Sequence, residues 1–230
     1  MQSVHIKEND MLKGVIFDFN GTLFFDSDYH FQVFRELKKE ITGNDLTLEE
    51  MEKEYSGRPN KEIFKKMSND TFTDEQCEYY SKRKEEMYRE IVRKSEDAKL
   101  CPGAIQLFEY LKDKNIPFTI ASASIKENID FFVEYFHLDQ WFDVDKIVYD
   151  DGTYKDKVMM YEDAKKKIGV KDNVLIFEDS LSGIKCAHKI GASIIVIDRE
   201  NLRKYYQEYD VLQSVKDLSE SLETVKRLCE

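Results

Sequence analysis

The sequence has few of the residues that cross-link small secreted domains, and it lacks the apolar runs of membrane proteins. Only four of its 230 residues are cysteines, and they form neither a CxxC pair nor a zinc-finger spacing. We therefore expect reduced thiols and a cytoplasmic location. The first 13 residues are polar, unlike a signal peptide, and no run of about 18 apolar residues follows. We expect no membrane partner.

An excess of positive charge is also absent. The chain has 35 Lys and Arg against 46 Asp and Glu, a formal net charge of -11. A nucleic-acid-binding protein needs a basic face to neutralise phosphates, so we expect no nucleic-acid partner. A local basic pocket for a small anion is compatible with this balance. The length and the 41% apolar content suit one large domain or a domain with an insert, and we expect a monomer.

Short apolar runs alternate with stretches of helical periodicity over most of the chain. Strands are expected at 15–17, 116–121, 146–149, 173–177 and 193–197, and helices at 104–113, 126–136, 157–168 and 181–190. Strands that alternate with helices of about 10–15 residues predict βαβ units and a mostly parallel sheet. The expected fold class is therefore α/β.

Between Phe25 and Leu100 the pattern is helical only. The expected helices are 27–42, 48–55, 61–67 and 74–93. Ser27 is expected to cap the first of them. So many helical residues placed directly after the first strand predict a separate helical subdomain. We expect a core formed by residues 1–25 and 98–230, and an insert at 26–97.

Three of the expected strands end in pairs of polar residues. The pairs are Asp18 and Asn20, Ser122 and Ser124, and Glu178 and Asp179. In a parallel sheet these ends share one rim, where ligands of α/β proteins bind. Three carboxylates there would repel one another unless a cation neutralised them, and Mg²⁺ takes one or two carboxylates plus a substrate phosphate. The structural alternatives are an Asx turn at Asp18 and a helix cap at Glu178-Asp179.

The other polar residues near these ends suit phosphate chemistry. Ser122 precedes a helix and could contact a phosphate together with backbone N–H groups. Lys155, in a loop before a helix, could balance phosphate charge, although a loop lysine is more often simply solvated. Asp18 as a nucleophile would form an aspartyl-phosphate and split phosphoryl transfer into two steps.

In this order the residues resemble the haloacid dehalogenase superfamily, specifically its β-phosphoglucomutase-like phosphatase branch. Residues 18–22 read Asp-Phe-Asn-Gly-Thr and are similar to the first motif of that family, Asp-x-Asp-Gly-Thr, except at the second Asp. Ser122 and Lys155 resemble the second and third motifs. The Glu-Asp-Ser-x-x-Gly at 178–183 resembles the acidic fourth motif.

The resemblance implies a Rossmann-like core, a helical cap that closes over the site, a Mg²⁺ cofactor and a small phosphate ester as substrate. It implies catalytic roles for Asp18, Asn20, Ser122 and Lys155. It implies metal binding by Asp18, Asn20, Glu178 and Asp179, with Asn20 offering its backbone carbonyl. It implies substrate binding by Gly21, Thr22 and Ala123 and, in the cap, by His30, Arg58 and Lys84.

Asn20 departs from the family pattern, because an amide cannot take the proton that the family's acid/base Asp handles. General acid–base help is worth about 10²–10⁴-fold. Three explanations stay open: a natural Asn in a slow phosphatase or one with another base, an engineered substitution, and deamidation at Asn20-Gly21 that restores Asp in part of the sample.

Three functions compete at this point. The first is a Mg²⁺-dependent phosphatase acting on a small phosphorylated metabolite, such as a sugar phosphate. The second is a phosphosugar mutase of the same branch, which Asn20 disfavours because a mutase must repeatedly protonate sugar hydroxyls. The third is a phospho-ligand binding module that kept the metal site and lost turnover.

Overall fold

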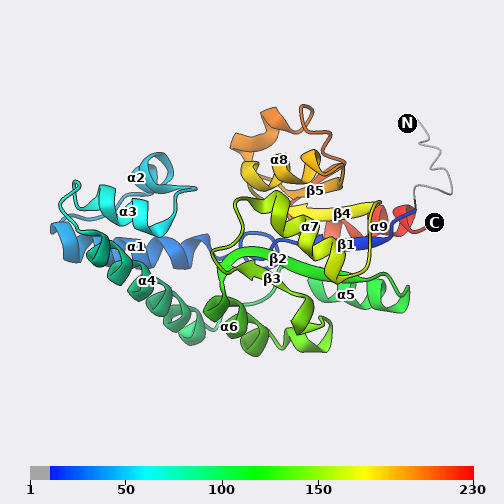
Figure 1. Ribbon diagram of the computed structural model, residues 1–230, viewed down its shortest axis with the longest axis horizontal. Helices are drawn as coiled ribbons and strands as arrows, with labels where there is room; N and C mark the ends of the chain where they lie inside the picture. The colour runs from blue at the N-terminus through cyan, green and yellow to red at the C-terminus, as the bar shows by residue number, and fades with distance from the viewer. Residues whose placement is uncertain (1–10) are drawn as a thin grey trace. The chain divides into compact units, whose positions relative to one another are not determined.

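A parallel sheet forms the centre of the larger of the two units into which the chain folds. In the computed structural model, which describes residues 11–230, the strand order is β3-β2-β1-β4-β5-β6, and every neighbouring pair is parallel. The strands are β1 Gly14–Phe17, β2 Phe118–Ile125, β3 Val148–Asp150, β4 Val174–Glu178, β5 Ser193–Ile197 and β6 Gln213–Val215. The predicted α/β class with a mostly parallel sheet is confirmed, and β1 lies between β2 and β4 (Figure 1).

The apolar run of β1 is buried because helices cover both faces of the sheet. Ile16 packs into a cluster on one face with Met160 and Ile184. Phe17 points to the other face, as the alternation of side chains along a strand requires. There its ring stacks on Phe177 at 4.9 Å and meets Phe108 edge-on at 5.4 Å. This central strand therefore ends at a fixed position.

The helices of the larger unit are α5 Ala104–Asp113, α6 Lys126–Phe136, α7 Lys157–Lys167, α8 Leu181–Lys189 and α9 Leu222–Leu228. α7 contacts β1, β2 and β3, and α8 contacts β4 and β5 (Figure 1). The first turns of α7 and α8 consequently lie near the carboxyl ends of the strands. That rim is where the polar residues were expected to converge.

Two strand predictions need correction, and one strand was not predicted. The strand expected to end before Ser122 continues to Ile125, so Ser122 lies inside β2. The weak strand expected at 146–149 is shifted to Val148–Asp150, and a 3-10 turn, Val144–Lys146, precedes it. β6 was not expected at all, because its three residues carry almost no apolar pattern.

The second unit, Asp26–Ala98, is the helical insert. It contains α1 Ser27–Thr42, α2 Leu48–Glu50 followed by a π-helical turn Met51–Tyr55, α3 Asn60–Met67 and α4 Asp74–Lys94. The core resumes at Lys99, one residue later than expected. Ser27 is the first residue of α1, not its cap: the cap position belongs to Asp26, which makes no side-chain cap bond.

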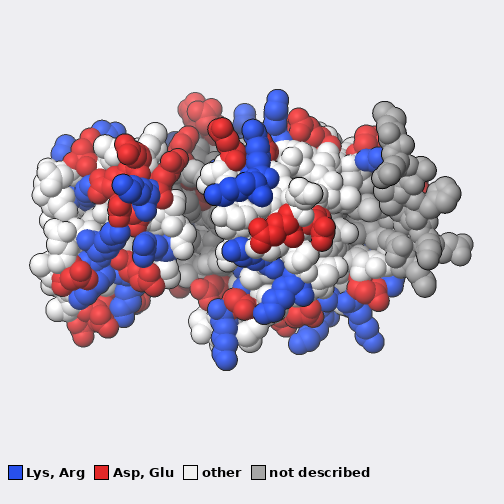
Figure 2. Space-filling model, turned by 90° about the horizontal axis from the view of Figure 1, so that it is seen from above, with Lys and Arg blue, Asp and Glu red and all other residues white. Residues whose placement is uncertain are grey.

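Among the described residues, none of the helices combines the length and the apolar content that a membrane span requires. On the face shown in Figure 2, basic and acidic side chains are interspersed over both units.

Candidate active site

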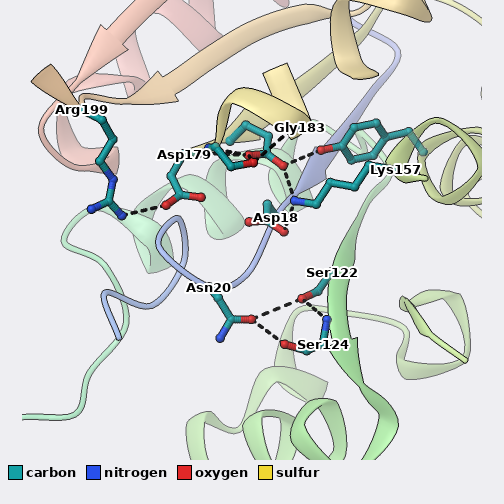
Figure 3. Close-up of polar contacts among 11 residues, drawn as sticks. Asp18, Asn20, Ser122, Ser124, Lys157, Asp179, Gly183 and Arg199 are labelled. Carbon is teal, nitrogen blue, oxygen red and sulfur yellow. Dashed lines mark hydrogen bonds and ion pairs between the residues drawn. The ribbon is translucent and has the colours of Figure 1, made fainter. Parts of the chain in front are cut away.

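Three carboxylates meet where β1 and β4 end. Asp18 directly follows β1, Glu178 is the last residue of β4, and Asp179 comes next. The two strands are in register, with Phe17 opposite Phe177, and the N–H of Asp18 donates to the carbonyl of Phe177 at 3.0 Å. Each carboxylate offers an oxygen within 4.8 Å of the others. Figure 3 shows Asp18 and Asp179 side by side at this place. The convergence expected from the strand ends is therefore present for these residues.

The lysine at this site is Lys157. Its Nζ lies 2.8 Å from Oδ1 of Asp18 and also bonds Oε1 of Glu178. Lys155, the lysine expected here, is exposed in the preceding loop, and the assignment is corrected. Lys157 begins α7, which Asp156 caps by accepting from the N–H of Met159. The helix start expected at 157 could have distinguished the two lysines, because it places Lys157 in the first turn of the helix and Lys155 in the loop before it.

Glu178 is fully buried, and both of its oxygens are engaged. Oε1 accepts from Lys157 and, at 2.7 Å, from the hydroxyl of Tyr161. Oε2 accepts from the N–H groups of Asp179 and Ser180 and from the Ser180 hydroxyl, each at 2.9 Å. A buried charge is tolerated when it is paired and bonded in this way. Glu178 therefore orients Lys157 and the start of α8.

Tyr161, which nothing in the sequence singled out, is also fully buried. It follows Lys157 by one helical turn, so both side chains lie on the same side of α7 and reach the same carboxylate oxygen. Periodicity alone marks Tyr161 as a core residue. The partner of its hydroxyl is visible only in three dimensions.

Burial and charge oppose each other at this cluster. Burial raises the pKa of Asp18 well above its usual range, and Lys157 counteracts part of that effect. Burial would also raise the pKa of Glu178, but Lys157 and the hydrogen bond from Tyr161 outweigh it and hold that pKa below its ordinary value. For Lys157, burial lowers the pKa, and the charges of Asp18 and Glu178 reverse this into a raised pKa.

Asp179 has different surroundings. Burial and the neighbouring Glu178 raise its pKa to about 6, against the opposing influence of Arg199. Nη2 of Arg199 donates to Oδ2 of Asp179 at 2.7 Å. Gly21, at φ 75°, lies against the same oxygen, and a Cβ there would come within 2.0 Å of it. Gly21 therefore makes room for Asp179.

Asn20 connects the loop after β1 to β2. Its Oδ1 accepts from the hydroxyl of Ser124 at 2.6 Å and from that of Ser122 at 3.4 Å (Figure 3). The N–H of Ser124 donates to the Ser122 hydroxyl at 3.2 Å. The structure thus brings Ser122 beside Asn20, as expected, and adds Ser124 to the site. A carboxylate at position 20 could accept the same two hydroxyls.

The remaining predicted residues differ in exposure. Ala123 is exposed on β2. Thr22 is fully buried, and its hydroxyl has no hydrogen-bond partner among the described residues. The N–H of Gly21 donates to the carbonyl of Phe24 at 2.7 Å. Of the residues expected to bind substrate at the core, only Ala123 therefore faces solvent.

His30, Arg58 and Lys84 belong to the insert. Nε2 of His30 lies 3.1 Å from a carboxylate oxygen of Asp26. Arg58 is exposed, at 3.8 Å from Glu62. Lys84 is buried, with its Nζ 2.9 Å from an oxygen of Glu85. A substrate role for these three stays a prediction.

The donor set fits a hard divalent cation. Three carboxylates face two positive groups, Lys157 and Arg199, and burial together with the neighbouring charges of Glu178 and Asp179 raises the pKa of Asp18. Carboxylate oxygens on two adjoining strand ends are ligands that Mg²⁺ prefers. Asp18 and Asp179 keep fewer internal bonds than Glu178 and are the better placed to offer an oxygen.

Comparison with known proteins places these residues in context. A family model described as haloacid dehalogenase-like hydrolase matches residues 15–197. A Saccharomyces cerevisiae protein named probable pseudouridine-5'-phosphatase is 26% identical over 230 residues, covering 94% of this chain and 95% of that protein. A Thermotoga maritima protein named phosphorylated carbohydrates phosphatase is 26% identical over 183 residues, covering 78% and 82%. A solved HAD hydrolase, family IA, variant 3, from Entamoeba histolytica is 38% identical with a TM-score of 0.87, covering 95% and 99%.

Proposed function

Because the chain belongs to the haloacid dehalogenase-like hydrolase family, we propose that it is a Mg²⁺-dependent phosphatase of small phosphorylated metabolites, in particular sugar phosphates. The observation that carries the proposal is the position of Asp18, whose carboxylate follows the central strand and is bonded by Lys157. The names of the two relatives, which refer to pseudouridine 5'-phosphate and to phosphorylated carbohydrates, support a phosphosugar substrate.

In the first step, a carboxylate oxygen of Asp18 attacks the phosphorus atom of the ester. The bond between phosphorus and the ester oxygen breaks, and its electron pair leaves with that oxygen. Lys157 and the Ser122 hydroxyl hold oxygens of the transferring phosphoryl group, which carries negative charge throughout. The departing alkoxide takes its proton from water, because the side-chain amide of Asn20 is too weak an acid to supply one.

In the second step, water attacks the phosphorus atom of the aspartyl-phosphate. The bond between phosphorus and the Asp18 oxygen breaks, inorganic phosphate is released, and the carboxylate is restored. Asn20, held by the hydroxyl of Ser124, orients that water without accepting its proton. Turnover is therefore slower than with an aspartate at position 20.

Asp18 and Asp179 would hold the divalent cation, with the backbone carbonyl of Asn20 as a third ligand and Glu178 acting through Lys157. When bound, the cation neutralises the carboxylates and stabilises charge on the transferring phosphoryl group. The role of the chain is to keep these oxygens in one place at the end of β1.

The test is phosphate release from a panel of sugar phosphates, measured with Mg²⁺ and with a chelator. We expect release only with the cation, and we expect Asp18→Asn to abolish it while the melting temperature stays near that of the wild type. Undiminished release by Asp18→Asn would overturn the assignment of the nucleophile. The binding module would be favoured if the wild type binds a phosphate analogue tightly without turnover and Asn20→Asp does not restore turnover.

The mutase alternative is separable in the same assay. With a sugar 1-phosphate and a bisphosphate primer, a mutase yields the 6-phosphate, whereas a phosphatase yields free phosphate. The side chain of Lys84, which the resemblance assigns to substrate binding, is buried and bonded to Glu85, and this does not favour the mutase.

A further inference from the structure

Arg199 makes a contact that the proposed reaction does not use. It lies two residues beyond the end of β5, and its guanidinium donates to Oδ2 of Asp179 at 2.7 Å. The arginine side chain is 37% exposed, whereas that of Asp179 is 16% exposed. In Figure 3, Arg199 reaches Asp179 from the side away from Lys157. Asp179 thus lies between the network of Glu178 and Lys157 on one side and the partly exposed guanidinium of Arg199 on the other.

The two basic residues of the site hold their carboxylates differently. Lys157 is 13% exposed and is shared between Asp18 and Glu178, so it is fixed by two partners. The guanidinium of Arg199 has Asp179 as its carboxylate partner and has solvent on its other side. A site that needs only a rigid Asp179 could use a neutral donor. An arginine adds a full positive charge beside a predicted ligand of a divalent cation.

We infer that Arg199 acts as an internal counter-ion of Asp179 and thereby lowers the affinity of the carboxylate cluster for its divalent cation. The inference rests on the cation site of the proposed function. A cation at the cluster must either share Asp179 with the guanidinium or displace it, and both arrangements place positive charges near each other. Because Arg199 is partly exposed, water screens part of its interaction with Asp179, so the loss of this ion pair opposes cation binding by a modest amount.

The backbone of Arg199 is held independently of its guanidinium. Its N–H donates to the hydroxyl of Tyr206 at 3.1 Å, and that hydroxyl also bonds Asp198 at 3.2 Å. Truncating the arginine therefore leaves the segment after β5 anchored. A nearby arginine, Arg203, bonds Asp198 and provides a matched control, because its removal takes away the same charge without touching the cluster.

The experiment is calorimetric titration of Mg²⁺ and of Mn²⁺ into the full-length wild type, Arg199→Ala, Arg199→Lys and Arg203→Ala. We expect Arg199→Ala to bind Mg²⁺ and Mn²⁺ about tenfold more tightly than the wild type. The effect is modest because the Arg199–Asp179 pair is partly exposed, so water screens most of the repulsion between the arginine and the cation. We expect Arg199→Lys and Arg203→Ala to stay within about threefold of the wild type, since one keeps the charge and the other loses it elsewhere. Thermal melts establish that all four are folded.

Unchanged or weaker binding by a folded Arg199→Ala would overturn the inference, and so would equal tightening in Arg203→Ala. If the wild type binds no cation, or if Asp179→Asn binds the cation as tightly as the wild type, the cation site itself is overturned instead. The two failures are therefore distinct. Because the readout is binding, it does not depend on knowing the substrate.

Discussion

Each unit of this protein contains a largely enclosed lysine that is paired with acidic side chains of the same unit, but the two lysines have different kinds of partner. In the core, Lys157 joins Asp18 and Glu178, which come from different strands and meet at the rim of the sheet. In the insert, Lys84 bonds its own sequence neighbour, Glu85, and lies 5.3 Å from the rings of Phe34 and Tyr88.

The two lysines differ in where their partners come from, and we predict that this difference, and not burial, marks a functional charge. The lysine of the insert is enclosed by contacts within its own unit. The lysine of the core brings together groups that would otherwise repel each other, at a place where a ligand can bind. The origin of the partners, from one helix or from separate strands, separates the two cases.

The strongest change expected is a gain at Asn20. With Asn20→Asp, kcat for a sugar phosphate should rise by about 10²–10⁴-fold, because the carboxyl group can protonate the departing alkoxide. For p-nitrophenyl phosphate the gain should be much smaller, since nitrophenolate leaves without a proton. Steady-state kinetics on both substrates check this. An equal gain on both would mean that position 20 acts only in the second step.

The next prediction breaks the core lysine. Lys157→Ala should lower kcat/KM by about 10²–10³-fold, the usual cost of removing one donor from a transferring charged group. Lys155→Ala is the matched control and should stay within about twofold, because that side chain is an exposed loop lysine. The two variants are compared on the same substrate. The reverse ranking would restore Lys155 as the phosphate-binding lysine.

Breaking the lysine of the insert should affect stability instead. Lys84→Met should cost about 1–3 kcal/mol, since Glu85 loses a buried partner and keeps the hydrogen bond from Asn60, and the melting temperature should fall by a few degrees. At low temperature, where the variant is folded, its activity should equal that of the wild type. Thermal unfolding and a low-temperature assay measure the two separately. Lost activity with an unchanged melting temperature would assign Lys84 to the substrate.

The smallest effect concerns the chemical fate of Asn20. Deamidation requires the nitrogen of Gly21 to attack the side-chain carbonyl carbon of Asn20. In the folded chain that N–H donates to Phe24, and the side-chain oxygen is held by Ser124. We expect no measurable conversion of Asn20 to aspartate during storage of the folded protein, and faster conversion in the isolated peptide. Peptide mapping by mass spectrometry compares them, and equal rates would contradict the prediction.

The sequence predicted those parts of the site that depend on strand ends. Asp18, Glu178 and Asp179 could be placed together because buried apolar runs ended at them and the strands were expected to be parallel. The insert was recognisable from the absence of strand signals. These features are local patterns combined with one topological rule.

What the sequence did not predict depends on side-chain reach. Lys155 and Lys157 differ by two positions, and only the start of α7 decides which one faces the rim. Tyr161 has the periodicity of an ordinary core residue, and the polar pair Asp198-Arg199 that follows the strand at 193–197 was not singled out. No local pattern marks their partners, because Glu178 and Asp179 lie about 20 residues away in the chain.

The glycine at position 183 shows how tightly the acidic pair is seated. A Cβ on that residue would lie 1.8 Å from Oε1 of Glu178, and the carboxylate could make room only by giving up hydrogen bonds that hold it. Glycine inside a helix usually forfeits roughly 0.5–1 kcal/mol relative to alanine. In α8 this loss is offset because the backbone of Gly183 can approach the Glu178 carboxylate closely. Gly183→Ala, a change that stabilises most helices, would here displace Glu178 from the hydrogen bonds that hold it.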